Sequence, residues 1–227
     1  MTAMREAAEL AERPLSDNPY DWLPVDDISQ ALERSGYIVL PNIIPEAIRD
    51  ELIQAAEIHA TQFRPAAIGR GSNEHRNVFV RRDKIAWMAG DDPNVQHWFA
   101  AMRALRLGLN RRLFLGLWDF ECHFAQYRSG DFYARHYDAF RGRSNRRVSL
   151  VAYLNRGWEP DQGGQLVLYP EGFGAKPLTI TPQMGTIVLF LAEEMLHEVL
   201  PVSRDRYSVA GWFRVNDTLD NRVDPLD

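Results

Sequence analysis

Two histidines and one aspartate in this 227-residue chain have the types and spacing of metal ligands. His136 and Asp138 are two residues apart, and His197 follows much later. Side chains two residues apart on a strand share a face, so His136 and Asp138 can reach one ion, whereas His197 must come from another strand. Two imidazoles and a carboxylate on one side of an ion form the facial triad of non-haem Fe(II) oxygenases, with positions left open for a cosubstrate and O₂. These three residues therefore predict an iron site.

The short spacing of His136 and Asp138 is weak by itself, because such a pair also occurs as a surface or hydrogen-bonded pair. The segment after His197 strengthens the prediction: residues 206–212 read as a strand whose even members, including Arg206, share a face. A buried arginine is costly without an anion, and its planar guanidinium matches a carboxylate. Arg206 is therefore a candidate for binding the distal carboxylate of 2-oxoglutarate. The alternative is a strand-edge arginine in a surface ion pair.

The composition is that of an ordinary globular protein, with 45% hydrophobic and 25% charged residues. The net charge of -5 gives no reason to expect a nucleic-acid partner. One cysteine allows neither an internal disulfide nor a thiolate-rich cluster, so the ligands of any metal are histidine and carboxylate. Residues 1–14 do not resemble a secretory signal, and no stretch approaches the roughly 20 apolar residues that cross a bilayer. We expect a monomeric cytoplasmic protein without a membrane partner.

The hydrophobic pattern divides the chain into a helical part and a β part. Residues 1–21 read as a loose lead-in and residues 22–227 as a single catalytic domain. Helices are expected from Asp27 to Gly36, from near Pro45, and over about 93–115, with a strand over 37–40. After Asp119 the period changes to two, and the expected strands are 120–127, 131–136, 147–154, 165–169, 178–180, 186–191, 198–202 and 207–215. This predicts a mainly β (α+β) fold, a double-stranded β-helix or jelly roll over about 119–215 with helical support from 22–118.

Several ordered motifs between about Val78 and Phe213 resemble one family. They comprise residues 80–87, 133–138, 153–155, 163–172 and 197–212. Together they resemble the prolyl hydroxylase domain enzymes, which include the animal hypoxia-inducible-factor hydroxylases, and especially the bacterial members. The resemblance implies Fe(II) as the metal, 2-oxoglutarate and O₂ as cosubstrates with ascorbate as a reductant, and hydroxylation coupled to release of succinate and CO₂.

The resemblance also implies roles for individual residues. Arg206 and Tyr153 would bind the distal carboxylate of 2-oxoglutarate, with Tyr127 near the cosubstrate. Three aliphatic residues would wall the cosubstrate pocket, although plain core packing accounts for them equally well: Val151, Leu166 and Val199. Five residues match positions near the substrate entrance, and we call them the entrance group: Tyr133, Arg146, Trp87, Trp212 and Arg81. For the tryptophans, core packing is the alternative.

A prolyl residue within a protein is the leading substrate, and the resemblance to bacterial members makes elongation factor Tu a candidate. The polar segment between Phe63 and Lys84 resembles the family's mobile loop that closes over the substrate, although an ordinary solvated loop would look similar. Residues 139–147 are more basic than in the animal enzymes, and this difference leaves the identity of the substrate undecided. One alternative is a same-fold oxygenase acting on a free amino acid or other small molecule. Another is a non-catalytic sensor that binds iron and 2-oxoglutarate.

Overall fold

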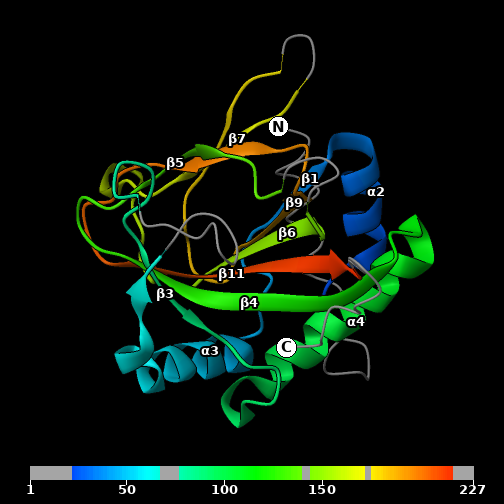
Figure 1. Cartoon of the computed structure of the whole chain (residues 1–227), viewed down its shortest axis with the longest axis horizontal. Helices are drawn as coiled ribbons and strands as arrows, with labels where there is room; N and C mark the ends of the chain where they lie inside the picture. Colours follow the sequence, from blue (N-terminus) through cyan, green and yellow to red (C-terminus); the bar gives the residue numbers. More distant parts are fainter. Residues whose placement is uncertain (1–21, 67–76, 140–143, 172–174, 217–227) are drawn as a thin grey trace.

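A computed structural model describes residues 22–66, 77–139, 144–171 and 175–216, and within them the chain forms two antiparallel sheets (Figure 1). The larger sheet has the strand order β1-β9-β6-β11-β4-β3-β2, and the smaller sheet has the order β5-β10-β7-β8. The strands are β1 (Tyr37–Leu40), β2 (Arg64–Pro65), β3 (Lys84–Trp87), β4 (Leu117–Tyr127), β5 (Tyr133–His136), β6 (Arg146–Tyr153), β7 (Leu166–Tyr169), β8 (Leu178–Ile180), β9 (Ile187–Leu191), β10 (Leu196–Val199) and β11 (Arg206–Val215).

Three α-helices cover one face of the larger sheet, and the smaller sheet lies toward its other face (Figure 1). They are α2 (Val25–Ser35), α3 (Glu46–Ile58) and α4 (Gln96–Leu113). Leu32, Leu52 and Leu105, one from each helix, share a buried cluster with Phe124 and Leu150 of the sheet. Because side chains alternate along a strand, the residues between these sheet positions face the smaller sheet. The helices therefore leave one face of β4, β6 and β11 for the candidate site.

Cys122 lies on the helix-facing side of β4 and is completely buried. Its thiol lies 3.6 Å from the sulfur of Met88. Burial raises the pKa of the thiol far above its usual range. Cys122 is therefore a packing residue of the core, on the face of β4 turned away from the smaller sheet.

The predicted mainly β jelly-roll fold is confirmed, while some element boundaries differ. β8 matches its prediction, and α2 ends at Ser35 with Gly36 as the expected glycine cap, whose left-handed φ of 75° suits glycine. The strand expected over 198–202 instead spans Leu196–Val199, because its ladder with β7 pairs those residues and its pairing with β5 is irregular. The short strands β2 and β3 were not predicted.

Some predictions fall outside the described residues. These include the 1–21 lead-in, most of the expected mobile loop with its glycines and arginines over 67–76, and part of the basic 139–147 segment. Within the ranges given above, no helix has the length and apolar character needed to cross a membrane.

Candidate active site

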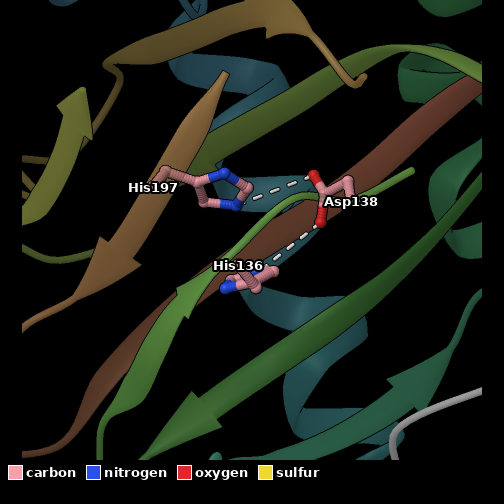
Figure 2. A group of neighbouring side chains, drawn as sticks. All are labelled: His136, Asp138 and His197. Carbon is pink, nitrogen blue, oxygen red and sulfur yellow. Dashed lines mark ion pairs between the residues drawn. The ribbon is translucent and has the colours of Figure 1, made fainter. Parts of the chain in front are cut away.

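His136, Asp138 and His197 come together at the smaller sheet (Figure 2). His136 ends β5 and lies opposite His197 of β10 in the strand register, so adjacent strands present both imidazoles on one face. Asp138 lies two residues beyond the end of β5 and reaches the same point from a loop. The three ligand atoms lie within 4.8 Å of one another. His136 Nε2 is 3.5 Å from Asp138 Oδ1, and His197 Nε2 is 3.8 Å from Oδ2.

Backbone hydrogen bonds set the orientation of both imidazoles. His136 Nδ1 lies 2.8 Å from the carbonyl oxygen of Ala134, and His197 Nδ1 lies 3.0 Å from that of Met195. Because a carbonyl oxygen only accepts, each Nδ1 carries the hydrogen and Nε2 keeps the lone pair that a metal requires. The triad is therefore oriented for binding a metal through two Nε2 atoms and a carboxylate oxygen.

The protonation states of the triad also suit a metal. Burial alone would raise the pKa of Asp138, but His197, His136 and a hydrogen bond from Ser149 outweigh burial and hold it well below its usual range. Burial, together with His136, lowers the pKa of His197 to about 4. At neutral pH Asp138 is thus ionised and His197 is neutral, which are the forms that coordinate metals. A His₂-carboxylate donor set of this kind fits Fe(II).

Arg206 lies completely buried inside the fold, with 1% of its surface exposed. Its Nε donates to the carbonyl oxygen of Gly164 at 2.9 Å, and one terminal nitrogen donates to Ser208 Oγ at 3.2 Å. The guanidinium lies 4.8 Å from the ring centre of Tyr127 and 5.1 Å from that of Tyr153. No carboxylate among the described residues forms an ion pair with it. The alternative given by the sequence, a strand-edge arginine in a surface ion pair, is therefore wrong for Arg206.

The hydroxyl of Tyr153, next to Arg206, is buried and has no hydrogen-bond partner within the described residues. Burial raises the pKa of Tyr153 to about 12, although Arg206 opposes the shift, so the hydroxyl stays protonated. A buried donor without a partner costs free energy, as does a buried cation without an anion. A carboxylate would satisfy both groups, so the residues present fit the distal end of 2-oxoglutarate.

The backbone before β7 approaches Arg206 closely because it contains two glycines. Gly163 and Gly164 have φ angles of 70° and 67°, which other residues rarely adopt. A Cβ atom on Gly163 would lie 2.1 Å from the carbonyl oxygen of Pro201, and one on Gly164 would lie 3.0 Å from Cδ of Arg206. This glycine pair allows the Gly164 carbonyl oxygen to hold the guanidinium.

The residues expected to wall the cosubstrate site belong to one buried cluster with Tyr153. Its members include Tyr127, Leu166 and Val199, and Val151 packs against it from a half-buried position. Of these residues, Tyr127 and Tyr153 lie beside Arg206, and the role of the three aliphatic residues as pocket walls stays a prediction. Their contacts are equally those of core packing.

The entrance group forms two contacting sets. Tyr133 stacks on His136, with ring centres 3.5 Å apart, and Arg81 lies 4.3 Å above the Tyr133 ring. In the second set, Arg146 lies 3.5 Å above the ring of Trp212, which is 6.4 Å from Trp87. Trp87 is 52% exposed, so its core-packing alternative is wrong.

Both entrance arginines pair with buried or nearly buried acids. Arg81 donates to both carboxylate oxygens of Asp83 at 2.8 and 2.6 Å, and Arg146 donates to Glu121 at 2.7 Å. Their charge is thus largely neutralised within the protein. Each guanidinium also lies over an aromatic ring of the entrance group, Arg81 over Tyr133 and Arg146 over Trp212.

Sequence reasoning missed several residues at the site. Ser149 donates a hydrogen bond to Asp138 at 2.6 Å. His123 lies between the two entrance tryptophans, 5.0 Å from Trp87 and 5.4 Å from Trp212. Alternation could have found both, since Ser149 is two residues before Val151 on β6 and His123 is four residues before Tyr127 on β4.

Comparison with known proteins agrees with this geometry. Residues 122–214 match the model of the 2OG-Fe(II) oxygenase superfamily. The fold superposes on a prolyl-4-hydroxylase of Pseudomonas putida with a TM-score of 0.77 and 36% identity, over 85% of this chain and all of that one. A second match is a prolyl hydroxylase from Trichoplax adhaerens in complex with a hypoxia-inducible-factor oxygen degradation domain peptide fragment. It superposes with a TM-score of 0.74 and 26% identity, over 84% of this chain and 88% of that chain.

A curated relative, the hypoxia-inducible factor prolyl hydroxylase of Caenorhabditis elegans, is 32% identical over 87 residues. That match spans 37% of this chain and only 12% of the relative's length. The Pseudomonas structure, by contrast, is matched over its full length at 36% identity, which is high enough to establish a family relationship. The chain therefore belongs to the prolyl hydroxylase-like 2OG-Fe(II) oxygenases, enzymes that use Fe(II) and 2-oxoglutarate.

Proposed function

We propose that the protein hydroxylates a prolyl residue in a protein substrate, with 2-oxoglutarate and O₂ as cosubstrates and succinate and CO₂ as products. One observation carries the cosubstrate assignment. Arg206 is completely buried, has no anionic partner among the described residues, and adjoins the unpartnered hydroxyl of Tyr153. A dicarboxylate whose other end reaches the triad satisfies both groups.

In this mechanism His136, Asp138 and His197 hold Fe(II), which when bound supplies the activation of O₂ and the oxidative decarboxylation of 2-oxoglutarate. Arg206 and Tyr153 bind the distal carboxylate and so fix the direction in which the cosubstrate enters. Tyr127, Val151, Leu166 and Val199 exclude water around its carbon chain. The entrance group orients the prolyl ring, and no side chain acts as a base, since the protein contributes orientation and the cofactor the chemistry.

A peptide substrate is supported by apolar side chains exposed near the entrance group. Phe79 is 83% exposed and Val78 39% exposed, close in sequence to Arg81, and Trp87 is 52% exposed. Exposed apolar side chains gathered near a site often mark a binding surface for another macromolecule. The Trichoplax relative was solved with a peptide bound. We propose bacterial elongation factor Tu as the candidate partner.

Mass spectrometry tests the proposal. Purified protein is incubated with Fe(II), 2-oxoglutarate, ascorbate and either elongation factor Tu or a cell extract, under ¹⁸O₂. The expected result is succinate formed in proportion to a prolyl residue that gains one ¹⁸O atom. The Asp138→Ala variant should form neither product, because the iron loses its carboxylate.

The other possible results assign the alternatives. Succinate without modified protein would favour a small-molecule oxygenase, and neither product would favour a non-catalytic sensor. Hydroxylation of a protein other than elongation factor Tu would overturn the proposed substrate but would support prolyl hydroxylation as the reaction.

A further inference from the structure

Asp138 is the one ligand of the triad that no strand holds. His136 and His197 belong to β5 and β10, whose backbones are hydrogen-bonded to each other. Asp138 lies beyond the end of β5, next to Ala139, whose N–H donates to the carbonyl oxygen of Ala192 at 3.2 Å. The backbone beside Asp138 is thus anchored near the end of β9, but its carboxylate needs a separate contact to stay in place.

Ser149 supplies that contact from the opposite sheet. It lies in the middle of β6, paired with Phe190 on one side and Trp212 on the other, and is 1% exposed. Its hydroxyl donates to Asp138 Oδ2 at 2.6 Å, and the ionised carboxylate can only accept. Backbone pairing on both sides fixes the position of Ser149, so the hydrogen bond ties the carboxylate to a rigid strand.

This hydrogen bond distinguishes the two carboxylate oxygens. Each oxygen faces one imidazole, with Oδ1 3.5 Å from His136 Nε2 and Oδ2 3.8 Å from His197 Nε2, but only Oδ2 accepts the hydrogen bond from Ser149. We propose that Ser149 is a positioning residue that restricts Asp138 to binding iron through a single oxygen. A hydrogen bond to the second oxygen weakens it as a ligand and fixes the plane of the carboxylate.

The number of open coordination positions gives this restriction a function. A six-coordinate ion held by a facial triad keeps three positions, enough for a chelating 2-oxo acid and O₂ together. A carboxylate bound through both oxygens would occupy one of those three. Ser149 therefore keeps a position available for O₂ by preventing Asp138 from chelating the metal.

The test uses Mn(II), which binds oxygen and nitrogen donors and, being paramagnetic, speeds water-proton relaxation in proportion to the number of waters bound to it. We compare the wild type with Ser149→Ala, which removes the hydroxyl, and Ser149→Thr, which keeps it. Ser29→Ala is the matched control, since Ser29 is also buried and donates to a backbone oxygen, Val25 O at 2.7 Å, but lies on α2. Thermal unfolding without metal establishes that each variant is folded.

We expect Ser149→Ala to bind Mn(II) about 10- to 100-fold more weakly, as is typical when a ligand's supporting hydrogen bond is removed. Its Mn(II) complex should also carry one bound water fewer than the wild-type complex. Ser149→Thr and Ser29→Ala should match the wild type in both measurements. If Ser149→Thr does not fold, Ser149→Cys replaces it and should give intermediate values, because a thiol is a weaker donor.

An unchanged number of bound waters in Ser149→Ala overturns the proposal, whatever happens to the affinity. So does a Ser149→Thr variant that behaves like Ser149→Ala. The measurement needs no substrate and no turnover. Its failure is therefore distinct from a failure to hydroxylate prolyl residues.

Discussion

The ring of Tyr133 lies flat against the ring of the metal-ligand candidate His136, with centres 3.5 Å apart and planes 14° from parallel. Tyr133 is paired with Val199 of β10, and its other face carries the guanidinium of Arg81. The stack therefore joins the entrance to the metal site and limits rotation of the His136 ring. Preserving that orientation requires an aromatic ring at position 133.

Replacing Tyr133 should consequently affect metal binding according to what replaces it. Tyr133→Ala should weaken Mn(II) binding by about 10-fold, because His136 loses a supporting contact. Tyr133→Phe keeps the ring and should bind Mn(II) like the wild type. Isothermal titration of the two variants tests the point, and equal affinities for both would contradict it.

Arg206→Ala should raise the dissociation constant for 2-oxoglutarate by about 10- to 100-fold, since a charge-assisted contact contributes roughly 1.5–3 kcal/mol. Arg206→Lys keeps the charge but loses the planar fork, so it should recover only part of the affinity. Titration of the Mn(II)-loaded protein with 2-oxoglutarate measures both. Affinity for Mn(II) alone serves as the control and should not change, while an unaltered 2-oxoglutarate affinity would exclude the assignment.

His123 should make the metal-free protein less stable in acid. Burial, reinforced by the charges of Arg81 and Arg146, lowers the pKa of His123 to about 3. An unfolded histidine has a pKa of about 6.5, so between these values the unfolded chain binds a proton that the folded chain does not. The stability contributed by neutral His123 is complete above about pH 6.5 and is lost as the pH falls toward 3.

Urea unfolding of the wild type and His123→Phe at several pH values checks this expectation. The free energy of unfolding should fall more steeply with acid in the wild type than in the variant. Parallel curves for the wild type and His123→Phe would refute the expectation.

Gly163→Ala should destabilise the fold more than Gly130→Ala. Both glycines have positive φ, at 70° and 88°, so both substitutions introduce backbone strain. Only at Gly163 would the added Cβ meet a backbone oxygen, 2.1 Å away, whereas nothing lies within 4 Å at Gly130. Thermal unfolding compares them, and 2-oxoglutarate affinity should also fall in Gly163→Ala because Gly164 holds Arg206. Equal loss of stability at the two positions would show that the close approach is unimportant.

Much of the fold could be predicted from local patterns. The alternation along residues 206–212 placed Arg206 on the inner face, and the structure buries it there beside Ser208. Gly36 signalled the end of α2 because a glycine suits the left-handed turn there. Such features depend on neighbours in the chain, which the sequence displays directly.

Features that depend on distant partners were harder to predict. β3 is a strand because its backbone pairs with β4, and no alternation in its short sequence announces it. Strand alternation was used to put Asp138 on the same face as His136, but β5 ends at His136 and Ser149 of the other sheet holds the carboxylate. Both outcomes arise from contacts between segments far apart in the sequence.

The position of Cys122 affects how the protein should age in the presence of iron and O₂. Its sulfur is sealed beneath the helices, and its raised pKa keeps it in the protonated form, which is a poor nucleophile. Peroxide formed by stray reactions of the metal would thus find no reactive thiolate at this residue. Inactivation in air should therefore not begin at this thiol, and reagents that only reduce oxidised cysteine should not reverse it.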